Sequence, residues 1–191
     1  MKLFLHICCS PCLAFPLEQL TQEGIELTGF WYNPNIHPFT EYQKRLNSLK
    51  SFAQVKNLKV IYKDSYDLED FFQKVLSQWF NNGENLDKRC QYCYEMRLSG
   101  TASEAKKQGF ENFSTTLLVS PYQKHNLLKE VGEKVGKSFG VDFYYRDFRP
   151  GYYEGRKMAK EMNLYVQKYC GCIFSEKERF KKKLNEAGKK V

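Results

Sequence analysis

The chain alternates short apolar runs of strand-forming residues with longer segments in which apolar residues recur at helical spacing, and this alternation most constrains its fold. Strands are expected at 2–7, 26–32, 58–62, 113–119 and 141–145. Helices are expected at about 10–24, 40–57, 67–80, 90–109, 124–139 and 154–162. Strands that alternate with helices are joined by right-handed crossovers, so the pattern predicts a three-layer α/β/α fold with a mainly parallel sheet.

Length and composition fit one domain. The chain has 191 residues, of which 42% are hydrophobic, enough to bury a core without disulfide support. We expect a single α/β domain over 1–191 with a basic helical C-terminal extension at about 173–191. No apolar run approaches the ~20 residues that cross a bilayer, and residues 1–7 lack the cleavage site of a signal peptide. A cytoplasmic location and no membrane partner are therefore expected.

Seven cysteines fall in three tight groups along the chain. The groups are Cys8, Cys9 and Cys12; Cys90 and Cys93; and Cys170 and Cys172. An odd number of cysteines in a reducing compartment argues against a framework of structural disulfides. The grouping favours metal binding or thiol redox chemistry.

The first two groups are expected at the starts of helices, where the helix dipole favours the thiolate. Ser10 is the predicted N-cap of the first helix, and a polar turn at 81–87 leads to the helix that carries Cys90 and Cys93. Cys8 and Cys9 follow the first strand, where nucleotide-binding relatives carry a phosphate loop. We therefore expect a nucleotide-hydrolase-like, HUP-type Rossmann-related topology with cysteines in place of that loop.

Four thiolates suit an iron–sulfur cluster or structural zinc. The wide separation of the groups favours iron–sulfur over a zinc ribbon, with zinc and metal-free thiol chemistry as alternatives. Cys9 and Cys12 also have the spacing of a thioredoxin-type motif, although that fold places a strand and a helix before it. Cys170 and Cys172 can close only a small, strained disulfide ring, which favours a redox-active pair over further ligands or free thiols.

A formal net charge of +8 and an aromatic content of 16% suit binding to unpaired RNA. An ordinary solvated basic surface is the alternative. His6, His37, His125, Asp64 and Asp147 are candidate proton donors, with structural hydrogen bonding or capping as the alternative for each.

Four motifs resemble those of the QueH-type epoxyqueuosine reductases, in the same order and from His6 to Cys172. They are His6-Ile7-Cys8-Cys9-Ser10-Pro11-Cys12; Cys90 and Cys93 followed by Tyr94 and Arg97; Thr115-Thr116-Leu117-Leu118-Val119-Ser120-Pro121-Tyr122-Gln123; and Tyr169-Cys170-Gly171-Cys172. Ser10 stands where many relatives have Ala.

The resemblance implies a tRNA-modifying enzyme that reduces epoxyqueuosine to queuosine at the wobble position without cobalamin. It implies a [4Fe–4S] cluster on Cys8, Cys9, Cys90 and Cys93, and a redox-active pair at Cys170 and Cys172. Cys12 is then a possible ligand in place of Cys8, a ligand of an additional iron, or a packing residue.

The implied partners are the anticodon loop of tRNA and an unidentified electron donor. The basic residues that could contact the phosphates of the tRNA are Lys44, Arg45, Lys124, Arg146, Arg149, Arg156 and residues 181–183. Tyr152 and Tyr153 are candidates for stacking on a base or for closing the core.

Overall fold

The computed structural model describes residues 1–81 and 88–187, with side chains over 1–77 and 88–181. Residues 82–87 of the polar turn predicted at 81–87 lie outside the described residues. Residues 188–191 of the predicted C-terminal extension and the side chains of residues 182 and 183 also lie outside them.

Five strands form one sheet in the order β3-β2-β1-β4-β5, and every neighbouring pair is parallel. The strands are β1 (Lys2–His6), β2 (Glu26–Trp31), β3 (Val60–Tyr62), β4 (Asn112–Thr115) and β5 (Asp142–Phe143). The chain winds outward in both directions from β1 and β4, so the strand order reverses between these two central strands. The predicted α/β fold with a parallel sheet is confirmed.

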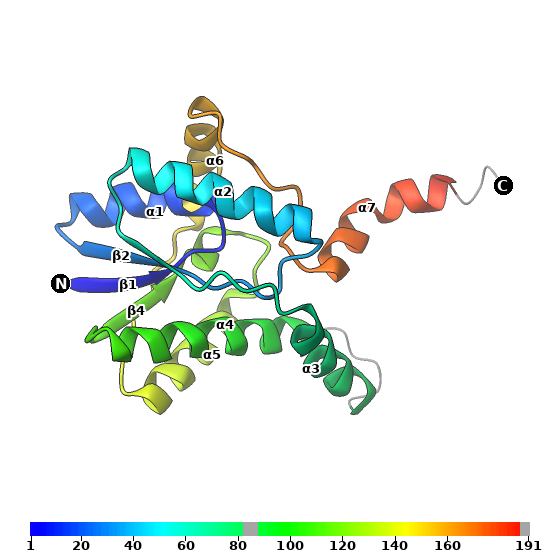
Figure 1. The fold of residues 1–191 in the computed structure, drawn as a ribbon, viewed down its shortest axis with the longest axis horizontal. Helices are drawn as coiled ribbons and strands as arrows, with labels where there is room; N and C mark the ends of the chain where they lie inside the picture. Colours follow the sequence, from blue (N-terminus) through cyan, green and yellow to red (C-terminus); the bar gives the residue numbers. More distant parts are fainter. Residues whose placement is uncertain (82–87, 188–191) are drawn as a thin grey trace.

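Helices cover both faces of the sheet (Figure 1). One face is covered by α1 (Ser10–Gln22), α2 (Phe39–Val55) and α6 (Tyr152–Glu161). The other face is covered by α4 (Lys88–Lys107) and α5 (His125–Phe139), and α3 (Leu68–Asn81) packs on α4. The last helix, α7 (Ile173–Ala187), extends away from these layers in Figure 1. No helix among the described residues combines the length and apolarity needed to span a bilayer.

Two apolar clusters fill the layers, and β1 contributes to both. Phe4 belongs to the cluster with Leu98 of α4, whereas Leu5 belongs to the cluster with Leu13 of α1 and Leu49 of α2. Each of these side chains is at most 1% exposed, and burying one stabilises the fold by about 1.5–3 kcal/mol. Burial on both faces explains why β1 is a continuous apolar run.

The strand predicted at 113–119 is wrong in its second half, because β4 ends at Thr115. The Thr115 side chain accepts a hydrogen bond from the Leu117 amide at 3.2 Å and so caps a short 3₁₀ helix, η1 (Thr116–Val119). This turn places Thr116 beside the residues that follow β1. A second 3₁₀ helix, η2 (Arg149–Gly151), leads into α6.

Candidate functional site

Three cysteine thiols gather at the start of α1, at the carboxyl end of β1. The Sγ atoms of Cys8, Cys9 and Cys12 all lie within 4.8 Å of one another, and all three residues are buried. No other set of three His, Cys, Asp or Glu residues in the described part of the chain is grouped in this way. Ligands bind at this edge of parallel sheets, where the strand order reverses.

The prediction that Ser10 caps α1 is wrong, because the N-cap is Cys9. Ser10 lies inside the helix and its hydroxyl is 3.0 Å from that of Ser48 on α2. The hydroxyl is therefore used to join two helices.

Hydrogen bonds within the group localise negative charge on Cys8. The pKa of Cys8 lies well below its ordinary value because the thiols of Cys12 and Cys9 hydrogen-bond to its sulfur, with a further bond of 3.3 Å from Thr116. Burial raises the pKa of Cys9, and the bond to Cys8 raises that of Cys12. A thiolate is the form of cysteine that binds metal.

The start of η1, directly after β4, holds Cys8 in place. Thr116 Oγ1 accepts a hydrogen bond from the Cys8 amide at 3.0 Å, in addition to donating to the thiol. His6 Nε2 donates to the Tyr32 carbonyl at 3.1 Å, which leaves Nδ1 to accept from Thr115 Oγ1 at 2.9 Å. Burial lowers the pKa of His6 to about 4, so the neutral ring joins the ends of three strands.

The second cysteine group begins α4, as predicted. Cys90 and Cys93 are separated by one turn and lie on one side of the helix. Cys93 is buried, and burial raises its pKa to about 12, although Arg97 acts in the opposite direction. Arg97 Nη2 donates to Cys93 Sγ at 3.1 Å and Nε donates to the Cys93 carbonyl at 3.2 Å.

Arg97 is a buried cation between the cysteine groups. It is 1% exposed and forms no ion pair with a carboxylate among the residues that the structure describes. Burial acts to lower its pKa, but the thiols of Cys93, Cys170 and Cys8 raise it above its ordinary value. A buried charge is costly without a counter-charge. The site is therefore suited to thiolates or to another anionic group.

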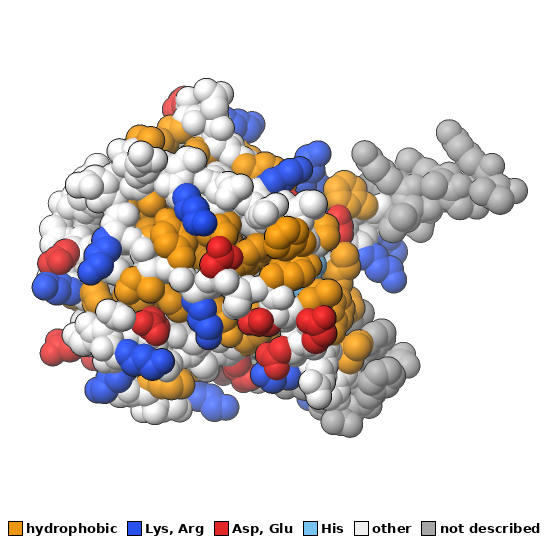
Figure 2. Space-filling model, viewed as in Figure 1, with side chains coloured by type: hydrophobic (Ala, Val, Ile, Leu, Met, Phe, Trp, Pro, Cys, Tyr) orange, Lys and Arg blue, Asp and Glu red, His pale blue; other side chains and the backbone are white. Residues whose placement is uncertain are grey.

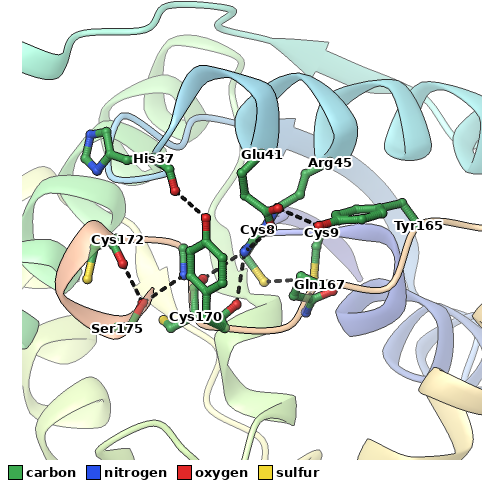
Figure 3. Close-up of polar contacts among 12 residues, drawn as sticks. Cys8, Cys9, His37, Glu41, Arg45, Tyr165, Gln167, Cys170, Cys172 and Ser175 are labelled. Atoms are coloured by element: carbon green, nitrogen blue, oxygen red, sulfur yellow. Dashed lines mark hydrogen bonds and ion pairs between the residues drawn. The ribbon is translucent and has the colours of Figure 1, made fainter. Parts of the chain in front are cut away.

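The third group lies on a loop that α2 holds in place (Figure 3). Arg45 donates to the carbonyl oxygens of Tyr169 and Cys170, each at 2.9 Å. Glu41 forms a buried ion pair with Arg45 at 2.6 Å and accepts the Tyr165 hydroxyl at 2.5 Å. We call Glu41, Arg45 and Tyr165 the loop clamp.

The expectation that Arg45 contacts phosphate is wrong, because its side chain is 1% exposed and bound to this loop. Gly171 crosses above it with a φ of +143°, a conformation that favours glycine. A Cβ there would lie 3.3 Å from Arg45 Nη1 and 3.1 Å from Ile36 Cγ1. Gly171 therefore permits the close approach of the cysteine loop to the loop clamp.

Cys170 is an exposed residue, although burial raises the pKa of its thiol, and Cys172 is half-buried. Both are thiols in the structure. Gln123 Nε2 donates to Cys170 Sγ at 3.2 Å, and the Tyr94 hydroxyl donates to Gln123 Oε1 at 2.8 Å. Since Tyr94 follows Cys93 on α4, these bonds connect the loop to the second cysteine group.

Gln167 contacts the first cysteine group, and no motif in the sequence indicates this role. Its Nε2 donates to Cys9 Sγ at 2.9 Å (Figure 3) and to Cys12 Sγ at 3.5 Å. Its Oε1 is buried and has no hydrogen-bond partner within the described residues. Gln167 therefore retains an acceptor for a group bound beside the thiols.

The other candidate proton donors lie in structural settings. The His37 backbone bonds to Gly171 and Tyr169, while both ring nitrogens are buried without a partner in the described chain. His125 Nε2 lies 3.1 Å from the Ser120 carbonyl. Exposed Asp64 accepts the Tyr42 hydroxyl at 2.8 Å, and exposed Asp147 accepts the Arg149 amide at 3.0 Å.

Basic side chains are spread over the surface. Arg146 pairs with Glu23 and Arg149 with Asp147. On the face that Figure 2 shows, Lys and Arg side chains are interspersed with Asp and Glu. The net charge of +8 therefore does not gather into one continuous patch on that face.

These contacts define the protein as an α/β protein with a site built from cysteines at the reversal point of a parallel sheet. The donor set fits a metal or metal–sulfur group: three thiols within 4.8 Å, a fourth and fifth on α4, and a buried guanidinium to balance their charge.

Comparison with known proteins identifies the family. Residues 3–178 match the family model for epoxyqueuosine reductase QueH. The epoxyqueuosine reductase QueH of Dehalococcoides mccartyi is 40% identical over 181 residues, covering 95% of this chain and 96% of that protein. The protein of the same name from Thermotoga maritima is 37% identical over 182 residues, covering 93% and 92%. The chain belongs to the QueH family, whose named members are oxidoreductases.

Proposed function

We propose that this protein reduces the epoxide of epoxyqueuosine to the alkene of queuosine at the wobble position of tRNA, without cobalamin. The observation that carries the proposal is the group of three buried thiols, those of Cys8, Cys9 and Cys12, whose Sγ atoms lie within 4.8 Å of one another. The match to the family over residues 3–178 supports it.

The proposed cofactor is a [4Fe–4S] cluster held by Cys8, Cys9, Cys90 and Cys93, with Cys12 available as an alternative ligand or for an additional iron. When bound, such a cluster supplies single-electron transfer in a site shielded from water. Three side chains position the thiols that would hold the cluster. Thr116 accepts a hydrogen bond from the Cys8 amide, Gln167 donates to Cys9 Sγ, and Arg97 donates to Cys93 Sγ and would offset the negative charge of the bound group.

Cys170 and Cys172 are proposed to be the redox-active pair. Removing the epoxide oxygen as water consumes two electrons and two protons, and oxidising two thiols to one disulfide releases the same number of each. The exposure of Cys170 supports this role, because a reductant has to reach the disulfide to restore the thiols. The proposed partners are tRNA and an electron donor of unspecified identity.

Burial of Cys9 and Cys12, which are 1% and 6% exposed, disfavours a general thiol–disulfide oxidoreductase that uses these two residues. A zinc-stabilised RNA-binding module is the other alternative, and metal analysis separates it from the proposal. Iron with labile sulfide is expected, whereas stoichiometric zinc without sulfide would favour the binding module.

The proposal is tested by anaerobic incubation of reconstituted protein with epoxyqueuosine-containing tRNA and a chemical reductant, followed by nucleoside mass analysis. Queuosine is expected to form without added cobalamin. Cys170→Ala should keep its iron yet lose at least tenfold in turnover. Gln43→Ala, an exposed change on α2, is the matched control and should retain full turnover. Unchanged epoxyqueuosine with iron-loaded wild-type protein contradicts the proposal.

A further inference from the structure

Two tyrosines stand out on the surface near the cysteine site. Tyr122 and Tyr153 are each 77% exposed, more than any other large hydrophobic side chain in the described chain. Tyrosine ordinarily buries much of its ring. Two such rings close together indicate a surface that another molecule covers.

The two rings are linked through Tyr152. The ring centroids of Tyr122 and Tyr152 are 5.9 Å apart at 79°, and those of Tyr152 and Tyr153 are 5.2 Å apart at 75°. Because these contacts are edge-to-face, the exposed rings keep face area open to solvent. The Arg156 guanidinium lies 5.6 Å from the centroid of the half-buried Tyr152. We call Tyr122, Tyr152 and Tyr153 the tyrosine platform.

The platform borders the cysteine site through two independent connections. The helix α6, which begins at Tyr152, packs against α1, which carries Cys12. Tyr122 directly precedes Gln123, whose amide donates to Cys170 Sγ at 3.2 Å. The platform therefore adjoins both the helix that carries Cys12 and the glutamine that contacts Cys170.

Two glycines hold α6 against α1 at this point. A Cβ on Gly155 would lie 2.8 Å from the Pro11 carbonyl oxygen, and a Cβ on Gly151 would lie 2.0 Å from the Phe15 ring. A larger residue at position 155 would collide with the backbone of α1, and one at position 151 would displace the Phe15 ring. The backbone that carries Tyr152 and Tyr153 is thus fixed against the turn of α1 that carries Cys12.

We infer that the tyrosine platform stacks the unpaired bases that flank the reacting nucleoside in single-stranded RNA. The inference rests on the proposed function and adds the surface that takes the rest of the loop. Exposed aromatic rings beside cations are the usual means of binding unpaired bases. The cations here are Arg156, the exposed Lys124 and Lys157, which pairs with Glu161 at 3.8 Å, and the acidic residue in the first turn of α6 is Glu154. This balance favours a polyanion over a protein surface.

The test uses anaerobically reconstituted full-length protein and a synthetic anticodon stem–loop RNA, with binding measured by fluorescence anisotropy. Tyr122→Ala and Tyr153→Ala are each expected to weaken binding by roughly 5- to 100-fold, the loss typical for one stacked base. Tyr122→Phe and Tyr153→Phe keep the ring and should bind within about twofold of wild type. Phe139→Ala removes an exposed ring at the end of α5 and is the matched control.

RNA with abasic sites beside the wobble position extends the test. Wild-type protein should lose affinity for the abasic RNA, whereas Tyr153→Ala protein should lose little more, because the same contact is already absent. Additive losses, or alanine variants that bind intact RNA as wild type does, overturn the inference.

Turnover separates this inference from the proposed function. If wild-type protein reduces epoxyqueuosine while the alanine variants bind RNA normally, the platform inference alone fails. If RNA binding depends on the tyrosines but no epoxyqueuosine is reduced, the proposed function fails and the platform stands. Variants with normal RNA binding that lose turnover only with a protein reductant would make the platform a docking site for the electron donor, which also overturns the inference.

Discussion

Arg97 places a positive charge in the protein interior where the available counter-charges are thiolates. The guanidinium donates to Cys93 Sγ and is 1% exposed. In protein without a cofactor the Cys93 thiol itself offers no counter-charge at neutral pH, because burial raises its pKa to about 12, and Cys8 is the thiol with a lowered pKa. The residue is best explained as a partner of an anionic group bound by the cysteines.

Replacing Arg97 with Met therefore has opposite effects on the two forms of the protein. The variant should release iron to a chelator at least fivefold faster than wild type, since charged hydrogen bonds contribute about 1.5–3 kcal/mol. The cofactor-free variant should unfold at a temperature equal to or above that of wild type. Iron release at the wild-type rate would show that Arg97 does not offset the charge of the cofactor.

His37 gives the fold a specific sensitivity to acid. Its ring is 2% exposed among Tyr66, Phe71 and Phe72, and burial lowers its pKa from 6.5 to about 4. The unfolded chain therefore binds a proton between these two pH values while the folded chain does not. The stabilising contribution is complete above pH 6.5 and is lost as the pH falls toward 4.

His37→Phe should weaken this dependence. The wild type is expected to lose about 1 kcal/mol between pH 7.5 and 5.5 through this residue, measured by urea unfolding of cofactor-free protein. The free energy of unfolding of the Phe variant should fall by about 1 kcal/mol less over this pH range. The Phe ring also places no unpaired nitrogen among the aromatic side chains. Equal pH dependence in both proteins would mean that the ring is not held neutral.

At the scale of elements, α2 acts as a brace for the cysteine loop. Glu41 and Arg45 are one helical turn apart, and Arg45 reaches two carbonyl oxygens of the loop. Helical phase places Arg45 on the same face as Tyr42 and Leu49, both buried. This spacing can be seen in the sequence. It indicates that Arg45 is buried, and it is a better guide to this residue than the nearby basic side chains, which suggested a phosphate contact.

Removing the loop clamp should impair the redox pair and leave the first cysteine group intact. Arg45→Lys keeps a positive charge but cannot bond to both carbonyls as the planar guanidinium does. The variant is expected to keep its iron and to lose about tenfold in turnover, with faster alkylation of the thiols at 170 and 172. Gln43→Ala serves again as the control. If Arg45→Lys turns over at the wild-type rate, the loop clamp contributes only to the stability of the fold and not to the redox pair.

Element boundaries at the site could not be read from local sequence because tertiary contacts decide them. Thr115 to Val119 is rich in strand formers, yet Thr115 uses its side chain to turn the chain into η1. Ser10 has the residue type of an N-cap, yet its hydroxyl contacts Ser48. Both exceptions occur where β1 and β4 deliver their residues to the site.

For the whole molecule, the alternation of strands and helices was sufficient to predict the parallel sheet and the edge where the cysteines meet. The grouping of cysteines predicted a metal or redox site. Spacing indicated that Cys12 belongs with Cys8 and Cys9, but it could not indicate that Gln167 contacts two of these thiols. Those contacts depend on how α1 packs against a segment more than 150 residues later.

We propose that the thiols at the start of α1 and on α4 hold one iron–sulfur centre, while Cys170 and Cys172 serve a separate redox role. Iron and acid-labile sulfide per chain, measured in anaerobically purified variants, test it most directly. Cys9→Ala and Cys93→Ala should each lose most of both elements, and Cys170→Ala should retain the wild-type content of both. Full iron and sulfide in Cys93→Ala, or their loss in Cys170→Ala, would contradict this account.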